Sequence, residues 1–314
     1  MKTYRIDHTQ LEEQMSLKPA AMAIGYFDGI HIGHSKVIQT AKDIADQKGM
    51  ESAVMTFDPH PSVVLGRERT EKDYITPIKD KETLIGKMGI DRLYIVTFSK
   101  AFASLTPQQF VDEFIIGLNV KHVIAGFDFS FGKKGEGTME TLPFHSRGKF
   151  EQTVVEKVSI EGEKVSSTLI RSLIEGGQVG DVPTYLGRRY QIRGTVIHGD
   201  NRGHTIGFPT ANIQLSDTYK LPKTGVYAVR MEVNGEWYDG VCNVGYKPTF
   251  RDQQPDKPSV EVHLFSFDAT IYGEEVTVEW CENIRSEQKF SSIDELKEQI
   301  ARDVETAKRI LQNS

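Results

Sequence analysis

Residues 21–177 alternate short apolar runs with segments whose apolar side chains recur every three or four positions. Four of the runs have the length of buried strands: "AMAIGY", "SAVMTF", "RLYIVTF" and "HVIAGFDF". After the first run, apolar residues recur at helical spacing between positions 37 and 45. Strands that alternate with amphipathic helices are typical of a parallel sheet with helices on both faces. The pattern predicts a doubly wound α/β domain.

A second helix is predicted at residues 106–117. Thr106 suits the N-cap because its hydroxyl accepts a backbone N–H. Pro107 suits the first helical position, where its missing N–H costs no hydrogen bond. Gly117 is then expected to end the helix.

Beyond residue 188 the pattern changes to short strands divided by turn residues. "GVYAVRMEV" and "EWYDGVCNVG" flank Asn234-Gly235, a pair that readily adopts the positive φ angles of a type I′ hairpin turn. "SVEVHLFSF" and "EEVTVEW" continue the alternation, so we expect a compact antiparallel barrel or sandwich. A helix that begins at Ser292 should pack on it. Its apolar face comprises Ile293, Leu296, Ile300, Val304 and Ala307.

The change of pattern agrees with what the length implies. A chain of 314 residues exceeds the usual size of one domain, so two separate cores are expected. The boundary falls near residues 183–188, and we place the two domains at 1–183 and 184–314. Because no internal repeat relates the halves, they should be unlike modules.

Composition narrows the functional classes. Hydrophobic residues make up 38% and charged residues 26% of the chain, and the mean hydropathy of −0.39 is that of a soluble globular protein. The net charge of −6 opposes broad binding to nucleic acid, and the sequence has neither an apolar signal segment nor an apolar run of membrane-spanning length. Cys242 and Cys281 lack metal-ligand spacing. We expect a cytoplasmic protein without nucleic-acid or membrane partners and leave self-association open.

A motif rich in histidine and glycine, "GYFDGIHIGH" at 25–34, follows the first predicted strand. In open parallel sheets, ligands bind at the carboxyl ends of strands, where helix N-termini present free N–H groups to anions. His31 and His34 share one face of the first helical turn, from which they would donate hydrogen bonds to phosphate oxygens. Three glycines leave the backbone open to a triphosphate: Gly25, Gly29 and Gly33. The combination predicts nucleotidyl transfer, whereas two isolated histidines would be read as ordinary surface residues.

A second phosphate-binding segment is predicted in "KVSSTLIRSLI". Ser167 and Thr168 stand at the start of a helix, and Arg171 follows one turn later, where its guanidinium would face the same anion. The plain alternative is that the hydroxyls only cap the helix.

The second half holds a candidate metal site in "GTVIHGDNRGHTIGFPTANI". Gly199 and Gly203 belong to a polar loop that leads to Pro209. The Thr210 hydroxyl and the Asn212 carbonyl are hard oxygen ligands of the kind that Mg²⁺ takes together with ATP phosphates. A P-loop is absent from the sequence, and the alternative reading is a simple turn before a strand.

Four motifs of the first half resemble, in the same order, the adenylyltransferase module of bacterial bifunctional riboflavin kinase/FAD synthetases: "GYFDGIHIGH", "TFDPHPS", "GFDFSFGKKGEG" and "SSTLIR". The resemblance implies that this half joins FMN to the AMP part of ATP, with catalytic phosphate contacts from His31, His34 and Arg171. It also implies nucleotide- or flavin-binding roles for Phe27, Asp28, Asp58, Pro59 and Asp128. One departure is Phe127, where the family pattern has a polar or acidic side chain.

Six further motifs resemble riboflavin kinase: "LGRRYQIRGTVIHG", "GHTIGFPTANI", "GVYAV", "GVCNVGYKPTF", "VEVHLF" and "IRSEQKF". The resemblance implies a small β-barrel that transfers the γ-phosphate of ATP to the ribityl 5′-hydroxyl of riboflavin. It assigns the deprotonation of that hydroxyl to Glu261 and the binding of Mg²⁺ to Thr210 and Asn212. Around the flavin it implies Asn243, Thr249, Arg285 and Phe290. His204 replaces an arginine that is frequent before "TIGFPTAN".

Two other classes compete with this bifunctional enzyme. "HIGH" also occurs in class I aminoacyl-tRNA synthetases, but the acidic balance and the lack of a basic stripe oppose a synthetase fragment with an RNA-binding β-domain. A flavin-binding regulator without catalysis would need neither Glu261 nor the histidines. If Glu261 stood alone, it would be read as an outward-facing strand residue. The expected substrates are riboflavin, FMN and ATP, with Mg²⁺ as the metal.

Overall fold

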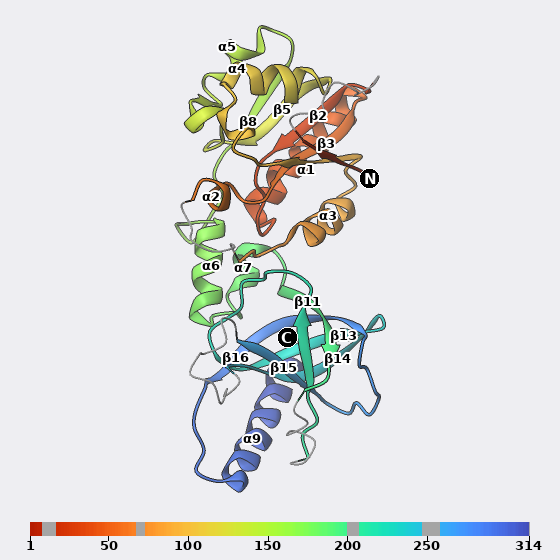
Figure 1. Cartoon of the computed structure of the whole chain (residues 1–314), viewed down its shortest axis with the longest axis vertical. Helices are drawn as coiled ribbons and strands as arrows, with labels where there is room; N and C mark the ends of the chain where they lie inside the picture. Colours follow the sequence, from red (N-terminus) through yellow and green to blue (C-terminus); the bar gives the residue numbers. More distant parts are fainter. Residues whose placement is uncertain (8–16, 67–72, 200–206, 247–257, 314) are drawn as a thin grey trace. The chain divides into compact units, whose positions relative to one another are not determined.

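The chain divides into two compact units, Met1–Ser167 and Thr168–Ser314, which we describe separately. The computed structural model describes residues 1–7, 17–66, 73–199, 207–246 and 258–313 (Figure 1). No helix within these ranges is both long and apolar enough to cross a membrane.

The first unit is built on a six-stranded sheet in which all neighbouring strands are parallel. Its order is β1-β4-β3-β2-β5-β8, so the doubly wound prediction is confirmed. The strands are β1 (Lys2–Ile6), β2 (Ala20–Ile24), β3 (Glu51–Asp58), β4 (Arg92–Thr97), β5 (Val120–Gly126) and β8 (Glu151–Val155). The edge strands β1 and β8 were not expected from the sequence, since both carry many polar residues.

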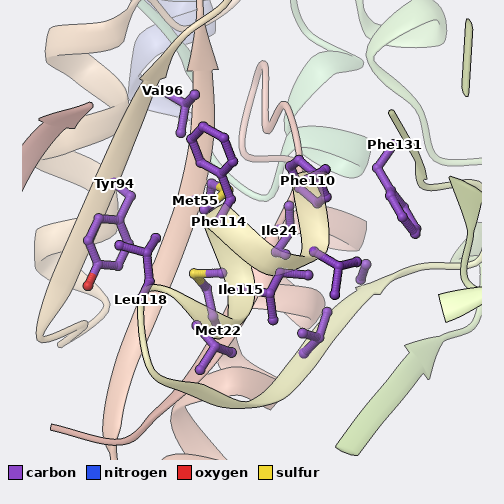
Figure 2. Packing of buried hydrophobic residues seen from close by; sticks show 14 of the residues in the cluster. Met22, Ile24, Met55, Tyr94, Val96, Phe110, Phe114, Ile115, Leu118 and Phe131 are labelled. Carbon is purple, nitrogen blue, oxygen red and sulfur yellow. The ribbon is translucent and has the colours of Figure 1, made fainter. Parts of the chain in front are cut away.

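Helices cover both faces of this sheet. Alternate residues of β2 enter different cores: Met22 and Ile24 pack on one side, and Ala21 and Ala23 on the other. The second side is covered by α1 (Ile32–Lys48) and α3 (Ile78–Lys87). The first is covered by α4 (Pro107–Phe110), the π-helical turn η3 (Val111–Ile116) and α5 (Leu142–Ser146). Figure 2 shows the aromatic and aliphatic side chains that meet on this first side.

The helix predicted at 106–117 begins after Thr106 and ends at Gly117 as expected, but its second part is the π-helical turn η3. Thr106 forms a full capping box with Gln109. Gly117 keeps right-handed angles (φ −60°, ψ −31°), and the left-handed residue that follows is Asn119, at φ 54°. A Cβ on Gly117 would lie 2.5 Å from the Glu113 carbonyl oxygen. The glycine is thus needed for close approach of the widened turn rather than for a left-handed cap.

The second unit contains a closed antiparallel barrel of order β11-β12-β15-β14-β13-β16. Asn234 and Gly235 adopt the predicted positive φ angles, 52° and 84°, between β13 and β14. The strands are β11 (Tyr190–Ile197), β12 (Ala211–Leu215), β13 (Gly225–Val233), β14 (Glu236–Gly245), β15 (Ser259–Leu264) and β16 (Glu275–Ser286). The barrel prediction is confirmed.

The terminal helix α9 (Ile293–Gln312) packs on the barrel, and Val304 and Ala307 of the predicted face take part in this contact. Ser292 caps it as expected, and Ala307 is buried together with Asp303 and Leu311. Ile293, by contrast, is 64% exposed, so the predicted apolar face was wrong in its first turn.

The remaining described elements are short. They are α2 (Pro61–Val64), η2 (Phe102–Ser104), β6 (Ser130–Phe131), η4 (Lys133–Gly135), β7 (Gly137–Thr138), β9 (Ser159–Ile160), β10 (Glu163–Lys164), α6 (Ser167–Gly176) and α7 (Val182–Leu186). Both cysteines are buried free thiols.

The first core supplies a stability prediction. Phe114 is fully buried, with ring centroids 5.1 Å from Phe102 and 5.7 Å from Phe110. We expect Phe114→Ala to lower the unfolding free energy of the first unit by about 3–5 kcal/mol, because it removes contacts and leaves a cavity. Urea titration followed by far-UV circular dichroism measures this change.

The matched control is Phe144→Ala, since Phe144 is 80% exposed; it should change stability by less than about 0.5 kcal/mol. Both tryptophans, Trp237 and Trp280, belong to the second unit, so the fluorescence transition should stay in place. A loss below about 1 kcal/mol in Phe114→Ala would contradict the prediction.

Candidate active sites

The first candidate site lies where β2 ends and α1 begins. β2 is paired with β3 on one side and β5 on the other, and the chain passes from β4 across to β5. The strand order therefore reverses at β2, and the crevice beyond its carboxyl end is where open α/β sheets bind ligands.

The turn between β2 and α1 has an unusual backbone. Phe27, Gly29 and Ile30 all have positive φ, at 50°, 92° and 42°. Such angles are uncommon for residues with a side chain and persist only where the surroundings enforce them. A Cβ on Gly25 would lie 2.7 Å from the Phe27 ring, so the ring folds back against bare backbone. The predicted glycines thus permit a compact turn that aims the next residues at the helix start.

The two histidines are in direct contact at the first turn of α1. His31 is the N-cap, and its Nδ1 accepts the backbone N–H of His34 at 3.2 Å. The two imidazoles stack with centroids 3.6 Å apart, and Phe27 meets the His34 ring edge-on at 5.3 Å. The Nδ1 of His34 is buried and lacks a hydrogen-bond partner among the described residues.

Burial controls the charge of both rings. Desolvation lowers the pKa of His31 from 6.5 to about 4, although Asp28 and Asp128 oppose the shift. Desolvation, followed by the charges of His31 and Lys81, holds the pKa of His34 well below its usual range. Both imidazoles are therefore neutral at pH 7. Because Nδ1 of His31 accepts a hydrogen bond, the ring proton belongs on Nε2.

Asp28 is buried and its carboxylate is engaged within the protein. One oxygen accepts the Thr76 N–H at 3.0 Å, and the other lies 3.4 Å from the Ile75 nitrogen. The Asp28 carbonyl also accepts the Ser167 hydroxyl at 2.8 Å. Asp28 therefore connects the motif to two segments that are distant in the sequence, one at Ile75 and Thr76 and one at Ser167.

Asp128 lies near His31 and pairs with a lysine that the sequence analysis did not single out. Lys164 Nζ is 2.9 Å from an Asp128 oxygen and 4.7 Å from the centroid of the Phe127 ring. Phe127, the departure from the family pattern, thus serves as an apolar platform for this cation.

The other predicted residues of this half occupy strand and helix ends. Asp58 ends β3 and is joined to Pro59 by a cis peptide bond. Gly33 lies in the first turn of α1, where a Cβ would come 3.2 Å from the His31 ring. Thr168 and Arg171 lie on α6 in the second unit, and their roles stay predictions.

The second candidate site is a row of residues across the barrel wall. Glu261 on β15 lies directly opposite Asn212 of β12 on one side and Asn243 of β14 on the other. Asn243 is opposite Val226 of β13, which in turn is opposite Arg285 of β16. Paired positions point their side chains to the same face. Register therefore places four predicted residues from four strands in one row.

Arg285 is held rigidly at the end of this row. Its guanidinium makes a bidentate ion pair with Asp303 of α9, with the Nη2–Oδ2 distance at 2.9 Å. The Phe290 ring centroid lies 5.7 Å from the guanidinium carbon. Asp303 is buried, and only the tertiary contact identifies it, because a lone helix aspartate carries no motif.

A cavity of about 250 Å³ is lined by Thr210, one of the two predicted metal ligands, but not by Asn212. Pro209 and Thr210 line it, and the Pro209 carbonyl is 2.7 Å from His263 Nδ1. The neighbouring Asn212 is buried; a Cβ on Gly199 would lie 2.1 Å from its amide nitrogen. The other lining residues are Val196, Ala211, Val262, Leu264, Phe267, Asp268, Ala269, Thr270, Ile271 and Tyr272.

Three predicted positions lie outside the described residues: Gly203, His204 and Thr249.

Comparison with known proteins decides the family. The FAD synthetase family model matches residues 13–169, and the riboflavin kinase model matches residues 186–311. The bifunctional riboflavin kinase/FMN adenylyltransferase of Bacillus subtilis is 53% identical over 100% of this chain and 99% of its own. That of Listeria monocytogenes is 46% identical over 96% of each chain.

The chain belongs to the bifunctional riboflavin kinase/FMN adenylyltransferase family. It phosphorylates riboflavin to FMN with ATP in its C-terminal half and adenylylates FMN to FAD in its N-terminal half. A crystal structure described as a macrolide-efflux protein from Streptococcus pneumoniae matches with a TM-score of 0.88 and 36% identity, over 97% of this chain and 98% of that one.

The burial of His31 gives this enzyme a pH-dependent stability. The unfolded histidine has a pKa of 6.5 and the folded one about 4, so between these values the unfolded chain binds more protons. Above pH 6.5 the histidine is neutral in both states, so its burial adds no pH dependence to the stability. As the pH drops from 6.5 towards 4, the unfolding free energy of the first unit falls by about 1.4 kcal/mol per pH unit.

His31→Asn tests this effect, because asparagine keeps an N-cap acceptor and does not titrate. Urea unfolding followed by circular dichroism at pH 7.5 and pH 5.0 should show a smaller acid loss in the variant than in the wild type. Equal acid losses in the two proteins would contradict the assignment of this proton uptake to His31.

Proposed function

We propose that His31 and His34 bind the triphosphate of ATP through hydrogen bonds during FAD synthesis. The observation that carries this role is the stacked, neutral imidazole pair at the N-terminus of α1. Neutral rings donate hydrogen bonds from fixed positions, and the helix N-terminus adds free N–H groups for an anion.

The chemistry needs alignment more than covalent catalysis. An oxygen of the FMN phosphate attacks the α-phosphorus of ATP, the bond to the β-phosphate oxygen breaks, and pyrophosphate leaves. No protein nucleophile is required, because FMN supplies the attacking anion. We propose that Arg171, Ser167 and Thr168 contact the phosphates. For FMN or adenosine we propose contacts from Asp58, Pro59 and Asp128.

In the kinase half, we propose that Glu261 orients and deprotonates the ribityl 5′-hydroxyl. The hydroxyl oxygen then attacks the γ-phosphorus of ATP, the bond from this phosphorus to the bridging oxygen breaks, and ADP leaves. Support comes from the row in the barrel wall, where Glu261 stands between Asn212 and Asn243. A carboxylate in the middle of a polar row is well placed to take a proton from a hydroxyl held there. Arg285 and Phe290 lie at the end of the row and would contact the flavin.

We propose Mg²⁺ as the metal of the kinase half, bound by Thr210 and Asn212. The donor set fits by its chemistry, because Thr210 offers a hydroxyl oxygen and Asn212 an amide oxygen two residues further on. Two neutral oxygen ligands suit a cation that retains water and phosphate ligands. When bound, the ion would neutralise charge on the transferred phosphate.

We propose the functional boundary at residues 183/184, which lies between the two family-model matches. ATP as the shared co-substrate supports a cytoplasmic location.

Replacing both histidines tests the first site. The double variant His31→Ala, His34→Ala should lose about 10²-fold or more in the FMN-to-FAD rate, because such preorganised donors act on developing charge. Riboflavin phosphorylation by the same sample, separated by chromatography, should be unchanged.

His145→Ala is the matched control, since His145 lies on α5 away from the motif. A double variant with an FMN-to-FAD rate within about threefold of wild type would rule out this role.

Glu261→Gln tests the second site. It keeps the shape and removes the base, so riboflavin phosphorylation should fall about 10²-fold or more while supplied FMN is still converted to FAD. The control is Glu275→Gln, an exposed glutamate at the start of β16 outside the row. Normal FMN formation in Glu261→Gln would refute the assignment of the base.

A further inference from the structure

Lys81 is a buried cation in the first turn of α3. Only 2% of it is exposed, and the sequence analysis gave it no role. A lysine at this place is unfavourable twice over, because burial removes water from its charge and the helix N-terminus is itself positive. The contacts of Lys81 must therefore offset the cost of burying its charge.

Those contacts lead to the histidine motif. Lys81 Nζ donates to the Tyr26 carbonyl at 2.8 Å and lies 4.3 Å from the centroid of the Tyr26 ring. The buried Thr56 hydroxyl donates to the same carbonyl at 2.9 Å. This carbonyl immediately precedes Phe27, the first of the positive-φ residues that lead to His31.

The turn after β2 and the start of α3 restrain each other. The Asp28 carboxylate accepts the backbone N–H of Thr76, in the segment that leads into α3. The turn therefore fixes the start of α3, and α3 fixes the turn through Lys81. Positive φ angles at Phe27 and Ile30 persist only under such external restraint.

The charge of Lys81 also reaches the site. Burial is the largest cause of the lowered pKa of His34. Two titratable groups lower it further, His31 at the N-cap of α1 and Lys81 of α3. The groups that act on His31 are Asp28, Asp128 and Lys164. Loss of the Lys81 charge would make His34 easier to protonate.

We propose that Lys81 is a positioning residue for FAD synthesis: its ammonium, bonded to the Tyr26 carbonyl, fixes the turn from which His31 and His34 reach the triphosphate. The inference rests on the roles proposed above for the two histidines. It assigns to Lys81 no contact with substrate.

Three variants test the proposal in the full-length enzyme. Lys81→Met keeps the stem and removes the charge, Lys81→Arg keeps a cationic donor, and Lys79→Met removes an exposed lysine from the same helix. FMN-to-FAD turnover, the KM for ATP and riboflavin phosphorylation are measured on each sample.

We expect Lys81→Met to lower the kcat of FAD synthesis roughly 10- to 100-fold, because a small misplacement of the donors impairs alignment, with the KM for ATP within about threefold. The acid limb of its pH–rate profile should move to higher pH, since His34 gains a proton more easily. Lys81→Arg should restore most of the rate. Lys79→Met and all kinase activities should match wild type.

Several results would overturn the inference. A rise in the KM for ATP larger than the fall in kcat would mean that Lys81 binds the triphosphate itself. An unmoved acid limb, or Lys81→Arg as impaired as Lys81→Met, would exclude positioning through the charge.

A different result separates this inference from the roles of the histidines. If the double histidine variant kept its FMN-to-FAD rate while Lys81→Met lost it, only the histidine roles would be contradicted, because Lys81 would then position another group on the same turn.

Discussion

Hydrogen-bond register between strands decides which side chains meet in both halves of this enzyme. In the barrel, register alone brings Asn212, Glu261, Asn243 and Arg285 into one row, although they are spread over four strands. A shift of one residue on any strand would turn its contribution to the opposite face. Closure of the barrel removes free edges, and the pairing of β13 with β16 changes register only locally, after Val226 and after Ala228.

In the first unit, the order of the parallel strands likewise decides where the functional residues lie. It places β2 at the reversal of strand order, so that the turn after β2 lies where open α/β sheets bind ligands. The turn itself is held from outside, by Thr56 of β3, Lys81 of α3 and Ser167 at the start of α6. Rigid donors of this kind stabilise developing charge without reorganising during the reaction.

The two reactions need different groups, and the structure supplies them separately. FMN brings its own anionic nucleophile, and the first unit offers neutral, buried imidazoles, which can donate hydrogen bonds to phosphate oxygens. Riboflavin brings a hydroxyl, and the barrel offers a carboxylate in a polar row. Arg285 owes its fixed position to Asp303, which joins the terminal helix to this row.

The sequence by itself determined the fold classes, the type I′ turn at Asn234-Gly235, the N-cap at Thr106 and the two motifs, because these depend on local periodicity and on neighbouring residues. It misplaced Ile293. It gave no sign of Asp303 or Lys81. Those residues act through partners far away in the chain. Only the tertiary structure decides register, burial and the pKa of a histidine, because each depends on atoms that the chain brings together only when it folds.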